Sequence, residues 1–212
     1  MNSYIKGISY YVPEKIITNN DLEKLMDTSD EWITSRTGIK QRHSVGDNPL
    51  GPSDLAVEST KKLFDKIDVK LEDIDFVIFA TSSPDTYVPG SGSIFQHKMG
   101  LNNIGVLDIR QGCCGFVYAI SVADQFIKAG TYKNILVVGS EVQTTQLDYD
   151  TEGRGTAIIF GDGATSALVQ PTKSQGKGIL SSHLHSDGKY ISELGTMVPS
   201  PVVKGLINKK NI

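Results

Sequence analysis

The sequence is poor in cysteine and contains no long hydrophobic run. Its two cysteines, Cys113 and Cys114, are neighbours in a chain of 212 residues. Adjacent cysteines rarely pair with each other, so they provide no disulfide framework, and we expect reduced thiols. The N-terminus lacks the apolar core of a signal peptide, and no apolar run approaches the roughly 20 residues that cross a bilayer. A cytoplasmic location without membrane insertion is therefore expected.

The sequence also lacks a surplus of basic residues. It has 21 Lys and Arg residues against 24 Asp and Glu residues, which leaves a formal net charge of -3. This balance argues against nucleic acid or an anionic membrane as the main partner. With 39% hydrophobic and 21% charged residues, the composition is that of an ordinary globular protein with a hydrophobic core.

Apolar segments and amphipathic segments alternate along the chain. Residues 76–80, 104–109 and 135–139 are predicted to be strands, and the first and last of these read as buried strands. The other predicted strands are 4–12, 156–160, 164–169 and 178–185, and the predicted helices are 20–26, 29–37, 53–67, 89–100 and 114–129. The alternation favours α/β layers around a largely parallel sheet.

Several local signals place the ends of these elements. Residues 28–31 (Thr-Ser-Asp-Glu) match a capping box, and Gly38 is the expected end of the helix that follows. Ser53 is the predicted cap of the helix 53–67. Asp162 lies between two glycines and is predicted to serve a tight turn between two strands. Residues 171–178 are rich in turn formers and read as a linker, whereas the tail 208–212 is polar.

The residues around the two cysteines carry the strongest chemical signal. In residues 108–118 a strand is predicted to end, a glycine-flanked turn follows, and a helix begins. A thiol at that junction faces unpaired N–H groups and the positive end of the helix dipole, which favour the thiolate and suit an oxyanion on a thioester carbonyl. A buried structural cysteine explains the spacing of these residues equally well. Physical reasoning does not decide between Cys113 and Cys114.

Residues 112–116 (Gly-Cys-Cys-Gly-Phe) resemble the nucleophile motif of the β-ketoacyl-acyl-carrier-protein synthase III family. Further blocks resemble this family in the same order, at 28–33, 36–39, 138–141, 154–156, 160–164 and 183–188. The match extends from Tyr4 to about Tyr190. Alignment on Gly115 and Phe116 implies that Cys113 is the nucleophile. Cys114 then occupies a position where the family usually has a small residue.

The resemblance implies a thiolase-like layered αβαβα fold and an acyltransferase that starts fatty-acid synthesis. Residues 1–170 would form a complete N-terminal half with the nucleophile, and residues 171–212 a linker and the incomplete start of a C-terminal half. Cys113 would take a short acyl group from acyl-coenzyme A, which is then condensed with malonyl-acyl-carrier protein. Acyl-coenzyme A and acyl carrier protein are the implied partners, with a homodimer, no metal and no redox cofactor.

The resemblance also assigns the coenzyme A site. Trp32 and Arg36 lie four residues apart and share a helix face, as a ring and a guanidinium that suit an adenine and a phosphate. Thr28, Trp32, Arg36 and Arg154 match the positions that hold the nucleotide and pantetheine. A surface helix with a half-buried tryptophan is the alternative interpretation. Val88 resembles a loop residue that limits acyl length.

Some expected residues are missing from the sequence. The family's decarboxylation step needs a histidine and an asparagine from the second half, and neither block occurs here. We therefore expect this chain alone to accept an acyl group without condensing it. Two alternatives stay open: a starter-unit condensing enzyme of secondary metabolism, and a non-catalytic half that acts as a binding or dimerisation partner. The glycines at 90–92 and the pair His183 and His185 lack the companions of a dinucleotide loop or a metal site.

Overall fold

The computed structural model describes residues 2–174, 176–190 and 193–195. Met1–Ser182 forms one compact unit, and His183–Ile212 forms a second, whose described part contains the 3₁₀ turn η4 (Gly188–Tyr190). The strands of the first unit are β1 (Asn2–Tyr11), β2 (Lys15–Thr18), β3 (Gln41–Ser44), β4 (Phe76–Ala80), β5 (Gly105–Ile109), β6 (Ile135–Val142) and β7 (Asp162–Thr172). Its α-helices are α1 (Asn19–Glu23), α2 (Asp30–Thr37), α3 (Pro52–Phe64), α4 (Ser91–Met99), α5 (Gly115–Lys128) and α6 (Arg154–Ala157). Its 3₁₀ turns are η1 (Leu71–Asp73), η2 (Gly112–Cys114) and η3 (Thr144–Gln146).

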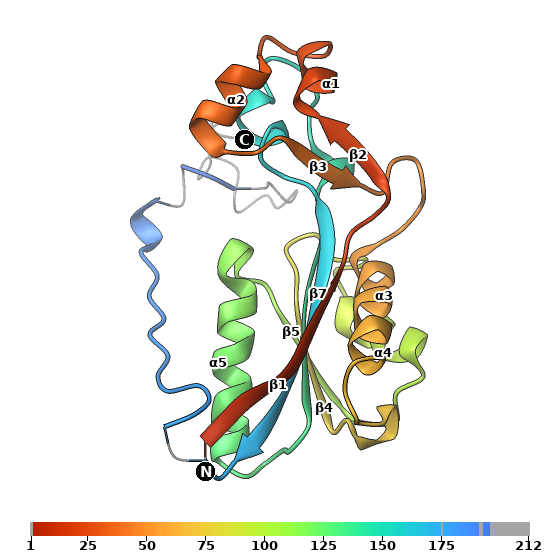
Figure 1. The fold of residues 1–212 in the computed structure, drawn as a ribbon, viewed down its shortest axis with the longest axis vertical. Helices are drawn as coiled ribbons and strands as arrows, with labels where there is room; N and C mark the ends of the chain where they lie inside the picture. The colour runs from red at the N-terminus through yellow and green to blue at the C-terminus, as the bar shows by residue number, and fades with distance from the viewer. Residues whose placement is uncertain (1, 175, 191–192, 196–212) are drawn as a thin grey trace. The chain divides into compact units, whose positions relative to one another are not determined.

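One mixed sheet of five strands organises the first unit. The strand order is β1-β7-β6-β4-β5. β4 runs parallel to both of its neighbours, β5 and β6, whereas β7 is antiparallel to β6 and β1 is antiparallel to β7. The three parallel strands are the segments predicted at 76–80, 104–109 and 135–139. Helix α5 covers one face of the sheet, and α3 and α4 cover the other (Figure 1).

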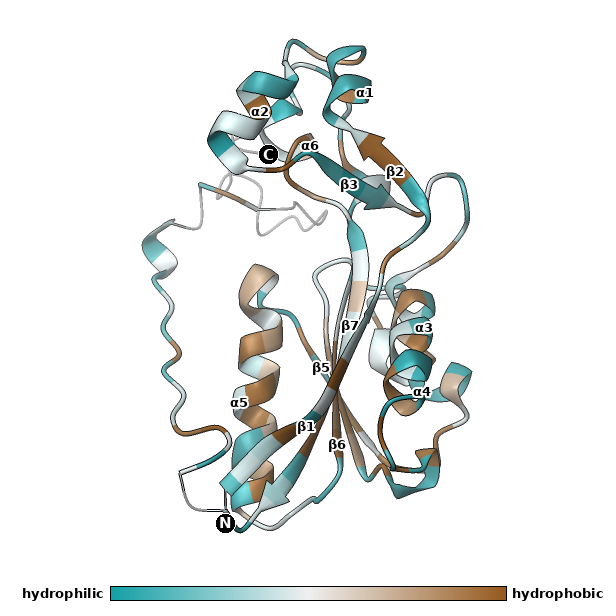
Figure 2. Ribbon diagram, viewed as in Figure 1, coloured by the Kyte–Doolittle hydropathy of each residue, from teal (hydrophilic) through white to brown (hydrophobic). Residues whose placement is uncertain are grey.

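Two hydrophobic cores lie on the two faces of this sheet. Side chains of a strand alternate between its faces, so Val77 and Phe79 pack toward α3 and α4, whereas Phe76 and Ile78 pack toward α5. All residues of β4 are buried. Because helices cover both faces, β4 has an uninterrupted apolar sequence instead of an alternating one. Figure 2 shows hydrophobic residues concentrated in the strands and along α5.

A smaller layer, here called the cap module (residues 15–44 and 154–158), lies at one end of the sheet. It comprises the antiparallel pair β2 and β3 with helices α1, α2 and α6. Its own core is formed by Leu22, Met26, Ile33, Ala157 and Ile158. The end of β6 is joined to the cap module by a hydrogen bond. The Ser44 and Thr144 hydroxyl oxygens lie 2.9 Å apart, just beyond the last residue of β6. The cap module therefore lies at the carboxyl end of the parallel strands (Figure 1).

The strand predicted at 156–160 is wrong. Residues 154–157 form α6, and the helical pattern continues through bonds such as Phe160 N–H to the Thr156 carbonyl at 3.2 Å. Ala157 and Ile158 are buried next to each other in the core of the cap module. Burial in this core therefore outweighs the preference of the two isoleucines in this segment for strands.

Asp162 is not a turn residue, as the sequence suggested, but the first residue of β7. Its side chain is buried and accepts hydrogen bonds from the amides of Val45, Gln143 and Thr144, each at 2.8 Å, and from the Thr144 hydroxyl at 2.5 Å. It therefore connects the end of β3, the end of β6 and the start of β7.

Two predicted helix caps are displaced. α2 is capped by Ser29, whose Oγ accepts the Trp32 amide at 3.0 Å, while Thr28 Oγ1 is buried and has no hydrogen-bond partner among the described residues. α3 starts at Pro52, and Asp54 accepts the Gly51 amide at 2.9 Å, so Ser53 is not its cap. Proline suits this first position because it lacks the N–H that the helix leaves unpaired.

The strand predicted at 178–185 is absent from the described residues. The one backbone hydrogen bond that this stretch makes to β1 runs from the Ile179 amide to the Ser3 carbonyl, at 2.9 Å. A strand requires a continued ladder of such bonds. Gly38, in contrast, ends α2 as predicted, with a left-handed φ of 73°. The predicted polar tail at 208–212 lies outside the described residues.

Candidate active site

The cysteine turn connects β5 to α5. After β5 ends at Ile109, residues Gly112–Cys114 form the 3₁₀ turn η2, and α5 begins at Gly115. Gly112 has a φ of 54°, a left-handed conformation that glycine adopts at little cost. At Gly115 an added Cβ would lie 3.3 Å from the Ala80 side chain, so the start of α5 packs closely on β4. The strand–turn–helix arrangement predicted from the sequence is confirmed.

Both cysteine thiols belong to exposed residues at the start of a long helix. Cys113 lies within η2, and Cys114 is the residue before the first turn of α5. The N-terminus of such a helix has unpaired amides and a partial positive charge, and it favours a negative charge nearby. This environment suits a thiolate or the oxyanion of a thioester under attack.

The loop that follows β4 leaves the sheet at the same edge as the cysteine turn. The Thr81 amide donates to the Ile109 carbonyl at 3.1 Å, which keeps the carboxyl ends of β4 and β5 together. Ligands of α/β proteins usually bind at this carboxyl edge. The cap module lies beyond this same edge of the sheet (Figure 1).

Two residues of the cysteine segment (residues 108–118) contact the loop at 85–90 and the helix α4 that follows it. The Asp108 carboxylate accepts the Gly92 amide at 2.9 Å at the start of α4, and partial burial raises the pKa of this carboxyl. The Arg110 guanidinium lies 4.9 Å from the centre of the Tyr87 ring. Val88, the predicted residue for acyl length, is 86% exposed next to Tyr87. The structure thus places Val88 in a loop that is attached to the cysteine segment.

The role of Glu141 at this edge was not predicted from the sequence. The Glu141 carboxylate accepts the Ser82 amide and hydroxyl, both at 2.8 Å, the Ser83 hydroxyl at 2.6 Å and the Gln143 side chain at 2.8 Å. It therefore fixes the loop after β4 to the end of β6. A carboxylate near the end of a largely apolar buried strand was the available signal.

The predicted coenzyme A residues gather in the cap module. The Arg36 guanidinium lies 4.3 Å from the centroid of the Trp32 ring, and that of Arg154 lies 4.6 Å from it. Arg154 also donates to the backbone carbonyl of Asp27, which precedes Thr28. The structure thus brings Thr28, Trp32, Arg36 and Arg154 close together, although Arg154 is far from the other three in the sequence.

Arg42 is a second charged group of the cap module that the sequence analysis overlooked. It is 4% exposed and donates to the carbonyls of Ile17 and Ile158 and to the side chain of Asn19. Burial lowers the pKa of this guanidinium, and burial also raises the pKa of the nearby Tyr149 hydroxyl. These contacts connect β3 to α1 and α6 and so hold the module together.

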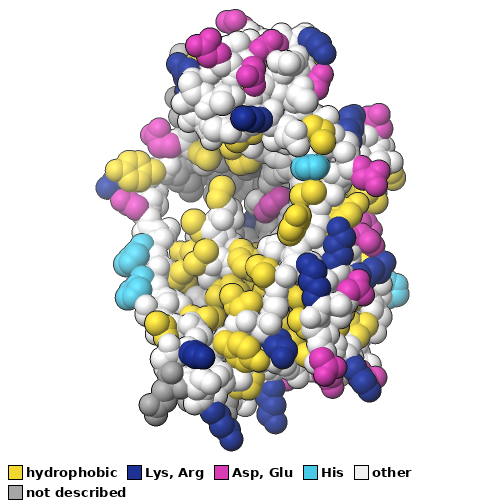
Figure 3. Space-filling view, in the orientation of Figure 1, with side chains coloured by type: hydrophobic (Ala, Val, Ile, Leu, Met, Phe, Trp, Pro, Cys, Tyr) yellow, Lys and Arg dark blue, Asp and Glu magenta, His cyan; other side chains and the backbone are white. Residues whose placement is uncertain are grey.

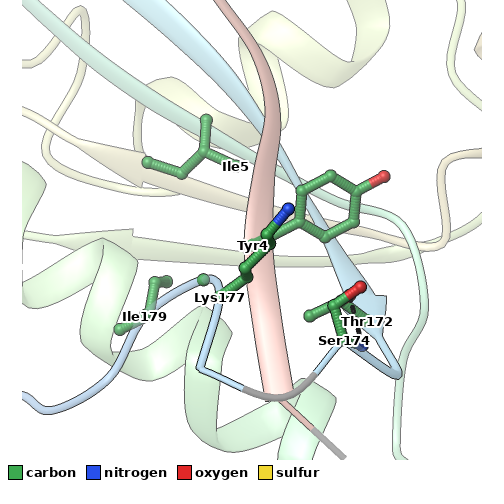
Figure 4. A pocket seen from close by; sticks show the side chains of 7 residues that line it. Tyr4, Ile5, Thr172, Ser174, Lys177 and Ile179 are labelled. Carbon is green, nitrogen blue, oxygen red and sulfur yellow. Dashed lines mark hydrogen bonds between the residues drawn. The ribbon is translucent and has the colours of Figure 1, made fainter.

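A separate hollow of about 600 Å³ lies at the opposite end of the sheet (Figure 4). Its lining residues are Tyr4, Ile5, Thr172, Ser174, Lys177, Gly178 and Ile179. Thr172 pairs with Asn2 at the far end of β7 from Asp162. This hollow is therefore distant from the cysteine turn and does not belong to the candidate site.

The described residues contain no group of three His, Cys, Asp or Glu side chains arranged for a metal ion. Within the same described ranges, no helix has the length and hydropathy needed to cross a membrane.

Comparison with known proteins adds to this picture. Residues 107–188, which include the cysteine turn, match the family model of 3-oxoacyl-[acyl-carrier-protein] synthase III. The chain is 46% identical, over 89% of its length, to β-ketoacyl-[acyl-carrier-protein] synthase III 1 of Bacillus anthracis, and it spans 59% of that protein. The crystal structure of β-ketoacyl-[acyl-carrier-protein] synthase III from Thermus thermophilus matches with a TM-score of 0.86 and 36% identity, over 93% of this chain and 60% of that one.

A relative from a different pathway is also similar. The priming β-ketosynthase of the R1128 polyketide pathway matches with a TM-score of 0.76 and 28% identity, over 82% of this chain and 55% of that one. The solved relatives establish a thiolase-like α/β fold, as expected from the sequence. This chain spans less than two thirds of the length of each of these relatives.

Proposed function

Because the chain belongs to the β-ketoacyl-acyl-carrier-protein synthase III family, we propose that it carries the acyl-accepting machinery of a condensing acyltransferase. The observation that supports this proposal most strongly is the exposed Cys113 in the turn between β5 and α5. The complete reaction condenses a short acyl-coenzyme A with malonyl-acyl-carrier protein and initiates fatty-acid synthesis. Since the chain spans 59% of its Bacillus anthracis relative, this complete reaction is proposed from the family alone.

The first half-reaction needs one thiolate and a place for negative charge. The Cys113 thiolate attacks the thioester carbonyl carbon, the carbonyl oxygen becomes an oxyanion, and the coenzyme A thiolate leaves as the acyl-cysteine forms. Amides at the start of α5 and the helix dipole stabilise the negative charge on that oxygen. This chemistry uses coenzyme A only as part of the substrate and requires no metal or redox cofactor.

The cap module is the proposed site for the nucleotide end of coenzyme A. Trp32 offers an aromatic plane with guanidinium groups at 4.3 Å and 4.6 Å, from Arg36 and Arg154. A ring of this kind stacks on adenine, and guanidinium groups bind phosphate through charge-assisted hydrogen bonds. Thr28 adds a buried hydroxyl beside this group. Val88 lies in the loop held by the cysteine segment, and we assign it the limit on acyl length.

The remaining properties are proposed in the same way. Acyl carrier protein is the second partner, a homodimer is the assembly, and the location is cytoplasmic. A starter-unit function in secondary metabolism is the second candidate, supported by the 28% identity with the polyketide priming enzyme. The 46% identity with a β-ketoacyl-[acyl-carrier-protein] synthase III favours fatty-acid synthesis.

A burst measurement tests the proposed half-reaction. The purified chain is mixed with a short acyl-coenzyme A, and the release of free coenzyme A is followed over time by chromatography, because the thioester is conserved when the acyl group moves to a cysteine. We expect a rapid release that stops at one coenzyme A per chain, and no release after both thiols have been alkylated with iodoacetamide. A release that alkylation leaves unchanged, or no release with the untreated chain, would contradict the proposal.

A further inference from the structure

Cys114 has no role in acyl transfer, which uses a single thiol. It is nevertheless exposed, directly follows Cys113, and belongs to the same turn η2. The chain contains no third cysteine. Within one chain, therefore, the only thiol available to react with an oxidised Cys113 is its neighbour.

We propose that Cys113 and Cys114 form a peroxide-reactive pair that closes into a reversible disulfide and protects the nucleophile. The Cys113 thiolate attacks hydrogen peroxide, the O–O bond breaks, and a sulfenic acid and one water result. The Cys114 sulfur then attacks the sulfenic sulfur, the S–O bond breaks, and a second water leaves as the S–S bond forms. Two thiols are oxidised and one peroxide is reduced, so the atoms and electrons balance.

The covalent geometry makes this disulfide temporary. The Cα atoms of consecutive residues are about 3.8 Å apart, which is shorter than the roughly 4.4 to 6.8 Å found in most disulfides. A disulfide between these residues is therefore strained, and strained or exposed disulfides are the ones most readily reduced. This agrees with reduced thiols as the resting state and gives the pair the character of a switch.

The surroundings of the turn allow the backbone to adjust. Gly112 has a φ of 54°, and no atom lies within 4 Å of the place where its Cβ would be. A second glycine, Gly115, follows the pair, and its amide donates to the Gly112 carbonyl across the turn. Such 3₁₀ bonds have poorer geometry than α-helical bonds. Gly112 can thus change its backbone angles before the pair, whereas the buried Gly115 keeps the start of α5 in place after it.

The consequence of the pair concerns what happens to an oxidised nucleophile. A lone sulfenic acid is oxidised further to sulfinic and sulfonic acids, which thiol reductants do not restore. Capture by Cys114 stops oxidation at the disulfide, which lacks a thiolate and accepts no acyl group. A dithiol reductant then returns both thiols. The effect on acyl uptake depends on the proposed function, whereas the oxidation chemistry does not.

The test compares the chain with Cys114→Ser after hydrogen peroxide treatment. Remaining thiols are blocked with iodoacetamide, and the peptide with residues 113 and 114 is weighed by mass spectrometry. For the unaltered chain we expect a peptide that is lighter by two hydrogen atoms, carries no alkyl group, and regains both thiols with dithiothreitol. For Cys114→Ser we expect added oxygen atoms that dithiothreitol does not remove.

Other outcomes overturn the proposal. These are oxygen addition in the unaltered chain to the same extent as in Cys114→Ser, disulfide-linked pairs of chains, or thiols that stay free under conditions that oxidise Cys114→Ser. Because residue 114 is exposed, serine is expected to leave the circular dichroism spectrum unchanged. A second measurement follows acyl uptake, which we expect to be restored by dithiothreitol only in the unaltered chain. Absence of uptake before oxidation counts against the proposed function, not against the peptide masses.

Discussion

Replacing Asp162 by asparagine tests how the cap module is attached to the sheet. One carboxylate oxygen accepts the Gln143 and Thr144 amides, and the other accepts the Val45 amide and the Thr144 hydroxyl. Asparagine keeps one accepting oxygen and places an NH₂ group where the other was. If the remaining oxygen still accepts the Gln143 and Thr144 amides, the new NH₂ group faces the Val45 amide. The buried Val45 N–H then has no acceptor.

The magnitude follows from these four bonds. A buried donor without an acceptor costs about 1–3 kcal/mol, and a hydrogen bond to a charged group is roughly 1 kcal/mol stronger than one to a neutral group. Together these losses should lower the free energy of unfolding by about 3–5 kcal/mol, a large part of the usual stability of a domain.

Urea denaturation followed by circular dichroism measures this change. The matched control is Asp65→Asn, since Asp65 is exposed and its carboxylate makes no hydrogen bond or ion pair that the structure describes. The control should shift the free energy of unfolding by less than about 0.5 kcal/mol. A loss below about 1 kcal/mol for Asp162→Asn would show that the four bonds do not hold the module as argued.

Two further predictions concern the cap module. Hydrogen bonds from the Thr18 side chain and backbone lower the pKa of Asp21 from 3.8 to about 2, so the stability this charge contributes is complete above pH 3.8 and is lost as the pH falls toward 2. Carbon NMR should give this midpoint, and Thr18→Ala should move it toward 3.8; an unchanged midpoint would refute the assignment. Arg154→Ala should weaken coenzyme A binding by roughly 10- to 150-fold, since a charge-assisted hydrogen bond contributes about 1.5–3 kcal/mol. Calorimetry with Lys61→Ala as the control measures this, and equal affinities in the two variants would remove Arg154 from the site.

The sequence was sufficient where the signal was local. The apolar run at 76–80 could only be a buried strand or part of a buried helix, and its length with the β-branched residues favoured a strand. The cysteine turn could be predicted because strand, glycines and helix follow each other within a few residues. Trp32 and Arg36 were expected on one face because four residues make about one helical turn. In the structure the Arg36 guanidinium carbon lies 4.3 Å from the centroid of the Trp32 ring.

The errors arose where distant residues decide the structure. Asp162 reads as a turn residue because its flanking glycines are visible in the sequence, whereas its hydrogen-bond partner Val45 is not. The segment 156–160 was predicted to be a strand because its apolar residues favour one. The packing of this segment against Leu22 and Ile33, which are distant in sequence, cannot be seen before the cap module is assembled. The role of Glu141 was missed for the same reason, since the hydroxyl groups that donate hydrogen bonds to its carboxylate belong to Ser82 and Ser83, in the loop after β4.

The most direct test of the account is to locate the acyl group. The chain and the variants Cys113→Ser and Cys114→Ser are incubated with a short acyl-coenzyme A under reducing conditions, and the peptide at the start of α5 is analysed by mass spectrometry. We expect one added acyl group in the unaltered chain and in Cys114→Ser, and none in Cys113→Ser. An acyl group that persists in Cys113→Ser and disappears in Cys114→Ser would contradict the assignment of the nucleophile.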